Sequence, residues 1–78
     1  MEKNITMADL KENETAIVKN LISHNNIRRR LQDIGLINNT LVRCQLISPS
    51  GNPSAYLIRG AVIALRNEDA KTVLVEYI

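Results

Sequence analysis

Residues 27–36 read IRRRLQDIGL and combine an apolar stripe, three consecutive arginines and a glycine. Ile27, Leu31 and Ile34 recur at i, i+4 and i+7, which places them on one face of a helix. Gly35 follows this stripe at the position where helices commonly end in a left-handed residue. The segment therefore predicts a short helix with a defined end and a basic exposed side.

The residues on either side of this ending strengthen the prediction. In a Schellman ending, the second residue past the helix end makes an apolar contact with a residue in the last turn. Leu36 and Leu31 occupy those two positions if Gly35 is the left-handed residue. Leu31, Ile34, Gly35 and Leu36 are therefore expected to define the fold of this segment.

Five strands and two single helical turns are expected around this helix. Alternation and turn residues predict strands at residues 14–21, 40–47, 55–59, 61–65 and 72–78. Gly60, between the third and fourth strands, indicates a tight bend or a close approach of backbones. One helical turn is expected after Thr6, with Asp9 as its capping partner, and another with Asn67 as its cap.

Two finer expectations concern the faces and caps of these elements. In the second strand, Val42, Cys44 and Leu46 share one face by alternation, and Cys44 is expected in the core. Either Asn25 or Asn26 is expected to cap the basic helix, because asparagine is a favoured N-cap residue.

The element order predicts a mainly β fold, a small five-stranded SH3-like barrel with one short helix between strands one and two. An OB-fold is the alternative, but it places its helix later and needs longer strands. The chain has 78 residues, 45% of them apolar, with two Tyr, no Phe and no Trp. Residues 1–78 are therefore expected to form one domain with an aliphatic core.

Composition and motifs argue against several functions. A net charge of +2 and the absence of Phe and Trp disfavour nucleic-acid binding. The chain has no phosphate-binding glycine loop, no paired carboxylates and no nucleophile triad, so we expect no enzyme and no catalytic or cofactor-binding residues. His24 is expected to be exposed, and with Cys44 in the core we expect no metal-binding residues. One cysteine and no readable leader or membrane span fit the cytoplasm.

Short motifs run through nearly the whole chain in a fixed order. They are Leu10-Lys11, Glu14, Ala16, residues 28–36, Thr40, Val42, residues 49–53, Arg59-Gly60, residues 64–66, Ala70 and residues 74–76. In this order and spacing they resemble the ferrous iron transport protein A (FeoA) family, whose members are small SH3-like barrels. Asn13 and Asn39 stand where that family usually has glycine, and Asn52 where it has aspartate. Asparagine tolerates the left-handed region, so both turns can form.

The resemblance implies a cytosolic accessory or regulatory protein of bacterial ferrous iron uptake. Its implied partner is the cytosolic region of a FeoB-type GTP-binding permease, which would bring it to the inner face of the membrane. Ferrous iron is the one metal ion that the resemblance suggests the protein could bind. A related domain forms the C-terminal part of iron-dependent repressors. An SH3-like metal-sensing or nucleic-acid-binding module is therefore the alternative function.

The residues expected to bind a partner are Arg28, Arg29, Arg30, Asp33 and Gly51. Guanidinium groups fixed on a helix pair bidentately with carboxylates or phosphates. The competing interpretation is a solvated helix face, with an Arg29–Asp33 pair and the head of Arg30 bonded to backbone carbonyls. The unpaired strand edges of an incompletely closed barrel would also allow two copies of the chain to associate.

Overall fold

The computed structural model describes residues 5–78, so the first four residues of the expected domain lie outside it. Its elements are β1 (Ile5–Thr6), η1 (Met7–Asp9), β2 (Thr15–Leu21), α1 (Asn25–Asp33), β3 (Leu41–Ile47), β4 (Ser54–Ile58), β5 (Ala61–Leu65), α2 (Asn67–Ala70) and β6 (Val73–Tyr77). The predicted fold class and element order are confirmed. The described strands number six rather than the five expected. The sequence did not reveal β1, because a strand of two residues cannot display an alternating pattern.

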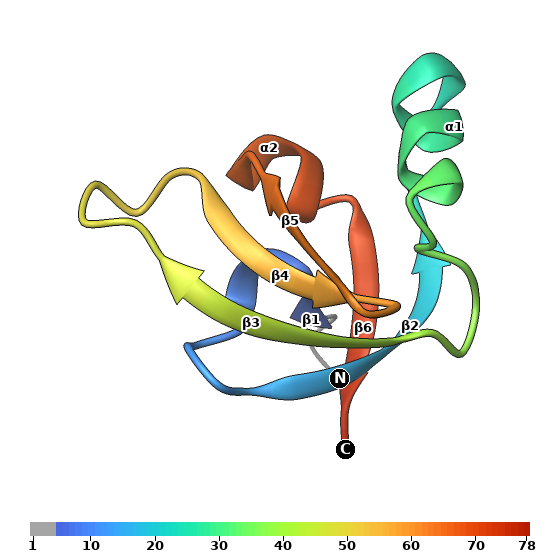
Figure 1. Ribbon diagram of the computed structural model, residues 1–78. Coiled ribbons are helices and arrows are strands. Elements are labelled where there is room, and N and C mark those ends of the chain that lie inside the picture. The colour runs from blue at the N-terminus through green and yellow to red at the C-terminus, as the bar shows by residue number, and fades with distance from the viewer. Residues whose placement is uncertain (1–4) are drawn as a thin grey trace.

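These strands form one antiparallel sheet in the order β1-β6-β2-β3-β4-β5, which curls into a partly open barrel (Figure 1). The sheet edges are β1 and β5. A two-residue turn joins β4 to β5, with φ +51° at Arg59 and +84° at Gly60. This is the tight bend that Gly60 predicted. A Cβ on Gly60 would meet no atom within 4 Å, so backbone conformation rather than crowding favours glycine there.

The barrel core is aliphatic except for Tyr56. Its buried members are Met7, Leu10, Ala16, Val18, Leu21, Leu31, Leu36, Val42, Cys44, Tyr56, Ile58, Leu65, Ala70, Val73 and Val75. The Tyr56 hydroxyl donates to the Met7 carbonyl at 3.2 Å, which ties η1 to β4. The Asp9 carboxylate accepts from the Thr6 N–H at 2.9 Å, as the predicted cap requires. The N-terminal turn is thus fixed both at its start and from within the core.

A β-bulge in β3 overturns one of the predicted faces. The register of β3 against β4 shifts between Cys44 and Leu46, which makes Gln45 the extra residue. A shift of one residue moves the following side chain to the opposite face. Val42 and Cys44 are therefore buried as expected, whereas Leu46 is 58% exposed.

The predicted Schellman ending of α1 is present. Gly35 has φ +109°, and its N–H donates to the Gln32 carbonyl at 3.0 Å. The Leu36 N–H donates to the Leu31 carbonyl at 3.1 Å, and both leucines are fully buried. This pair of bonds satisfies two carbonyls that a helix end otherwise leaves without partners.

The start of α1 differs from the expectation. His24 is the N-cap residue and makes no side-chain capping bond, while Asn25 is the first helical residue with φ +56°. Neither Asn25 nor Asn26 therefore caps the helix. Ile27 is exposed although Leu31 is buried, because α1 projects from the barrel and its N-terminal turn does not reach the core (Figure 1).

We expect Gly35→Ala to destabilise the protein by about 1–3 kcal/mol, because its backbone is left-handed. In addition, a Cβ at this position would lie 2.5 Å from the Cδ atom of Arg59. Gly60→Ala is the matched control, since its φ is also positive but its Cβ meets nothing. Urea unfolding measures both variants. Gly35→Ala should lose more stability than Gly60→Ala. Equal losses would show that the contact of the introduced Cβ with Arg59 costs nothing.

Candidate partner-binding site

The three consecutive arginines of α1 have three different environments. Arg28 is half-buried, and its Nη1 donates to the Leu21 carbonyl at the end of β2. The Nη2 of Arg30 lies 2.9 Å from Oδ2 of Asp69. Arg29 is exposed and has no side-chain hydrogen bond or ion pair within residues 5–78. Two of the three arginines therefore hold the fold, and Arg29 is free to contact another molecule.

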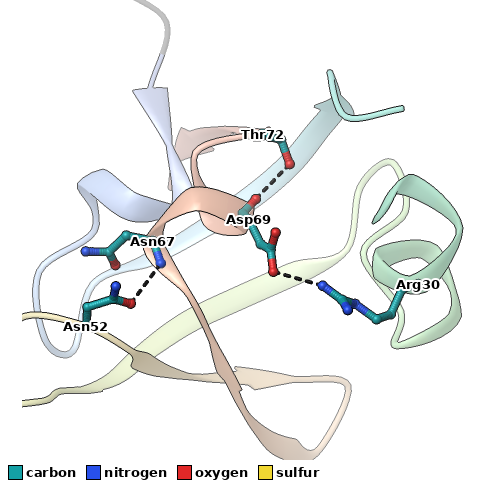
Figure 2. Close-up of polar contacts among 5 residues, drawn as sticks. All are labelled: Arg30, Asn52, Asn67, Asp69 and Thr72. Carbon is teal, nitrogen blue, oxygen red and sulfur yellow. Dashed lines mark hydrogen bonds and ion pairs between the residues drawn. The ribbon is translucent and has the colours of Figure 1, made fainter. Parts of the chain in front are cut away.

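The Arg30–Asp69 ion pair joins α1 to α2 (Figure 2). Asp69 is only 7% exposed and lies in the first turn of α2, where the helix dipole favours a carboxylate. The Thr72 hydroxyl donates to the Asp69 carbonyl at 2.7 Å and fixes the end of the same turn. The pair thus adds a lateral attachment to a helix whose N-terminal half projects from the barrel.

The sequence-based alternatives for these side chains are only partly correct. Arg30 pairs with a carboxylate rather than with backbone carbonyls, and Arg28 makes the carbonyl contact instead. The expected Arg29–Asp33 pair does not form in the described chain. The side chains of Arg29 and Asp33 are exposed and, being four residues apart, lie on one side of α1.

Gly51 does not join the arginines. It lies at φ +83° in the turn between β3 and β4, which Figure 1 shows at the opposite side of the barrel from α1. The Gly51 carbonyl accepts from Nδ2 of Asn67 at 2.9 Å. The Oδ1 of Asn52 accepts from the Asn67 N–H at 3.1 Å (Figure 2). Asn52 therefore serves α2 as an uncharged cap, where Asn67 had been expected to cap its own turn.

The sulfur and imidazole side chains do not assemble a metal site. Cys44 is a buried free thiol, and burial raises its pKa, with a smaller contribution from the negative charge of Glu12. His24 is exposed at the start of α1. No three His, Cys, Asp or Glu side chains gather in the part of the chain that the structure describes.

Neither described helix has the length and apolar character of a membrane span.

Sequence reasoning missed a hollow of about 670 Å³ on the outside of the sheet, here called the outer groove. Leu41, Arg43 and Leu57 line it from β3 and β4, Ile37 from the loop after α1, and Arg59 from the β4–β5 turn. Arg43 pairs with Leu57 across the two strands and alternates with buried residues. The exposed alternation of Leu41 and Arg43 was the available signal, but the groove itself depends on strand register.

The sequence matches the FeoA domain family over residues 5–77. No curated protein matches the chain in sequence. Its fold is similar to that of a FeoA-like protein from Clostridium acetobutylicum, with 28% identity and TM-score 0.89, over 100% of this chain and 91% of that one. FeoA of Stenotrophomonas maltophilia, solved with zinc and described as a prokaryotic SH3 domain protein, is 30% identical. Its TM-score is 0.83 over 92% of this chain and 89% of that one.

The fold also recurs in a transcriptional regulator. A manganese-dependent transcriptional repressor, solved with manganese, has TM-score 0.87 and 15% identity, and it matches 100% of this chain with 38% of its own. At this identity the likeness concerns the fold alone. It confirms that the SH3-like barrel is shared with part of a repressor, as the sequence resemblance implied.

We expect Arg30→Ala to lower the free energy of unfolding by about 1 kcal/mol, because Asp69 would remain buried without its charged partner. The loss stays modest because the Arg30 side chain is 64% exposed, so solvent screens the pair. Arg29→Ala is the adjacent control and should lie within about 0.5 kcal/mol of the wild type. Urea unfolding of both variants checks this. Equal stabilities would contradict a structural role for the ion pair.

Proposed function

The chain belongs to the FeoA family, and from this premise we propose that it serves bacterial ferrous iron uptake by binding the cytosolic region of a FeoB-type permease through α1. In this proposal the protein is a non-catalytic subunit at the inner face of the membrane. It acts on the GTP cycle or the gating of the permease. Ferrous iron is the cargo of the permease.

The observation that carries the proposal is that the three arginines of α1 differ in their contacts. Arg28 and Arg30 are engaged within the fold, while Arg29 and Asp33 have no partner among the described residues. An exposed arginine can make a bidentate contact with a carboxylate of another protein, and an exposed aspartate can accept one from a cation. A face that offers both charges favours one orientation of a partner over others.

The attachment of α1 supports the same proposal. Its C-terminal end is held by the Schellman bonds at Gly35 and its side by the Arg30–Asp69 pair at 2.9 Å. A helix held in place before binding loses less conformational entropy when a partner docks on it. α1 projects from the barrel (Figure 1), and its residues Arg29 and Asp33 are exposed.

The described relatives are consistent with a regulatory role. The S. maltophilia FeoA structure carries the suggestion of a bacterial ferrous iron transport activating factor for that protein. We extend to this chain the mode of action, a small domain that acts on a transporter.

The proposal predicts that Arg29→Glu weakens binding to the cytosolic domain of the cognate permease by about tenfold. Isothermal titration calorimetry with the purified domain measures the Kd at low and at physiological salt. Binding by the wild type should weaken as salt rises, since exposed charges contribute to it. Arg29 is the residue to change because Arg28 and Arg30 also hold the fold.

Lys11→Glu is the control, because it makes the same change of charge at an exposed residue outside α1. It should leave the Kd within about twofold of the wild type. No binding by the wild type would reject the proposed partner. Equal weakening by Arg29→Glu and Lys11→Glu would reject α1 as the contact and leave only a general electrostatic attraction.

A further inference from the structure

The outer groove has an apolar floor that the fold does not cover. Leu41 is 56% exposed and Ile37 47% exposed, and Leu57 lies half-buried between them and β5. Val62, which pairs with Leu57 across the strands, is 61% exposed and extends the apolar surface beyond the groove. The outer groove has a volume of about 670 Å³, which falls in the range of ligand-binding clefts.

The charged groups of the groove all have one sign. Arg43 and Arg59 line it, and no carboxylate does so in the described chain. The one recorded polar partner of the Arg43 guanidinium is the amide oxygen of Asn13, at 3.1 Å. Neither arginine forms an ion pair within the residues that the structure describes. The groove therefore presents two uncompensated positive charges beside an apolar surface.

Arg59 occupies a backbone position that does not suit an arginine. With φ +51° at Arg59 and +84° at Gly60, the turn has the left-handed pair of residues for which Asn-Gly or Asp-Gly is preferred. An arginine there stores backbone strain, which contacts of its side chain must offset. Its Cγ and Cδ lie close to Gly35, so the stem packs on the end of α1. The same side chain also lines the groove.

From these features we propose that the outer groove binds a short segment of a partner protein in which an apolar side chain is flanked by carboxylates. The apolar side chain would lie on Leu41 and Leu57, and the carboxylates would pair with Arg43 and Arg59. A nucleic acid fits less well, because the floor is aliphatic and offers no aromatic ring for base stacking. The proposal depends on neither the family nor α1, since the groove is built from other residues.

The test is selection of twelve-residue peptides from a phage-displayed random library on the immobilised wild-type protein. The enriched peptides should combine Asp or Glu with Leu, Ile or Val. Fluorescence anisotropy of a labelled winning peptide should then show that Leu41→Glu and Arg43→Glu each raise the Kd by about tenfold or more. Amide chemical-shift changes on peptide addition should centre on Leu41, Arg43 and Leu57.

Two controls match the chemistry of these variants. Leu46→Glu changes a leucine of the same strand and of similar exposure, 58%, outside the groove. Lys11→Glu makes the same charge reversal at an exposed residue outside the groove. Both should leave the Kd within about twofold of the wild type. Urea unfolding of the four variants separates a lost contact from a lost fold.

Four results would overturn the proposal. These are a selection that yields no binding peptide, winning peptides without acidic residues, shift changes centred on α1, and equal losses in the groove variants and controls. A dimer in sedimentation velocity that Leu41→Glu abolishes would assign the groove to self-association instead. Binding of a twenty-nucleotide single-stranded DNA at physiological salt that Arg43→Glu abolishes would assign it to nucleic acid.

Discussion

Gly35 has no side chain, and its φ of +109° allows α1 to stop against the turn between β4 and β5. The two Schellman bonds at this point bury Leu31 and Leu36 and turn the chain toward β3. The Arg59 side chain packs over the glycine, so a Cβ at that position would force this side chain to move. This contact joins the end of α1 to Arg59, which also lines the outer groove.

The arginine block shows how structure and binding can share one short segment. A helix that projects from a small barrel buries little apolar surface of its own, so it depends on a few specific attachments. Arg28 and Arg30 supply two of them, to the Leu21 carbonyl and to Asp69. Arg29 makes no side-chain hydrogen bond or ion pair within the described residues, and our proposal assigns the contact with a partner to it. A run of three identical residues thus has three different environments.

Several signals that are local in sequence predicted their structures correctly, although the asparagine caps of α1 and α2 and the Arg29–Asp33 pair were wrong. The Gly35 ending, the Thr6–Asp9 cap and the tight bend at Gly60 each depend on residues only a few positions apart. The left-handed backbone at Asn13 and Asn39, with φ +74° and +73°, also agrees with the expectation for asparagine in place of glycine.

Features that join distant segments could not be predicted in the same way. The bulge at Gln45 changes which side chains of β3 are buried, and only the pairing with β4 reveals it. The Arg30–Asp69 pair spans 39 positions, and the Asn52 contact with α2 spans 15. The outer groove combines a loop, two strands and a turn, so its shape is a property of the folded barrel rather than of any motif.

Native-state hydrogen exchange at the Leu36 amide tests most directly whether α1 is held by its C-terminal end. This amide donates to the Leu31 carbonyl and belongs to a fully buried residue. If the ending anchors the helix, its exchange free energy should lie within about 1 kcal/mol of that of Val18 in the core of β2. Exchange of Leu36 as fast as that of the exposed residues in the first turn of α1 would contradict the account.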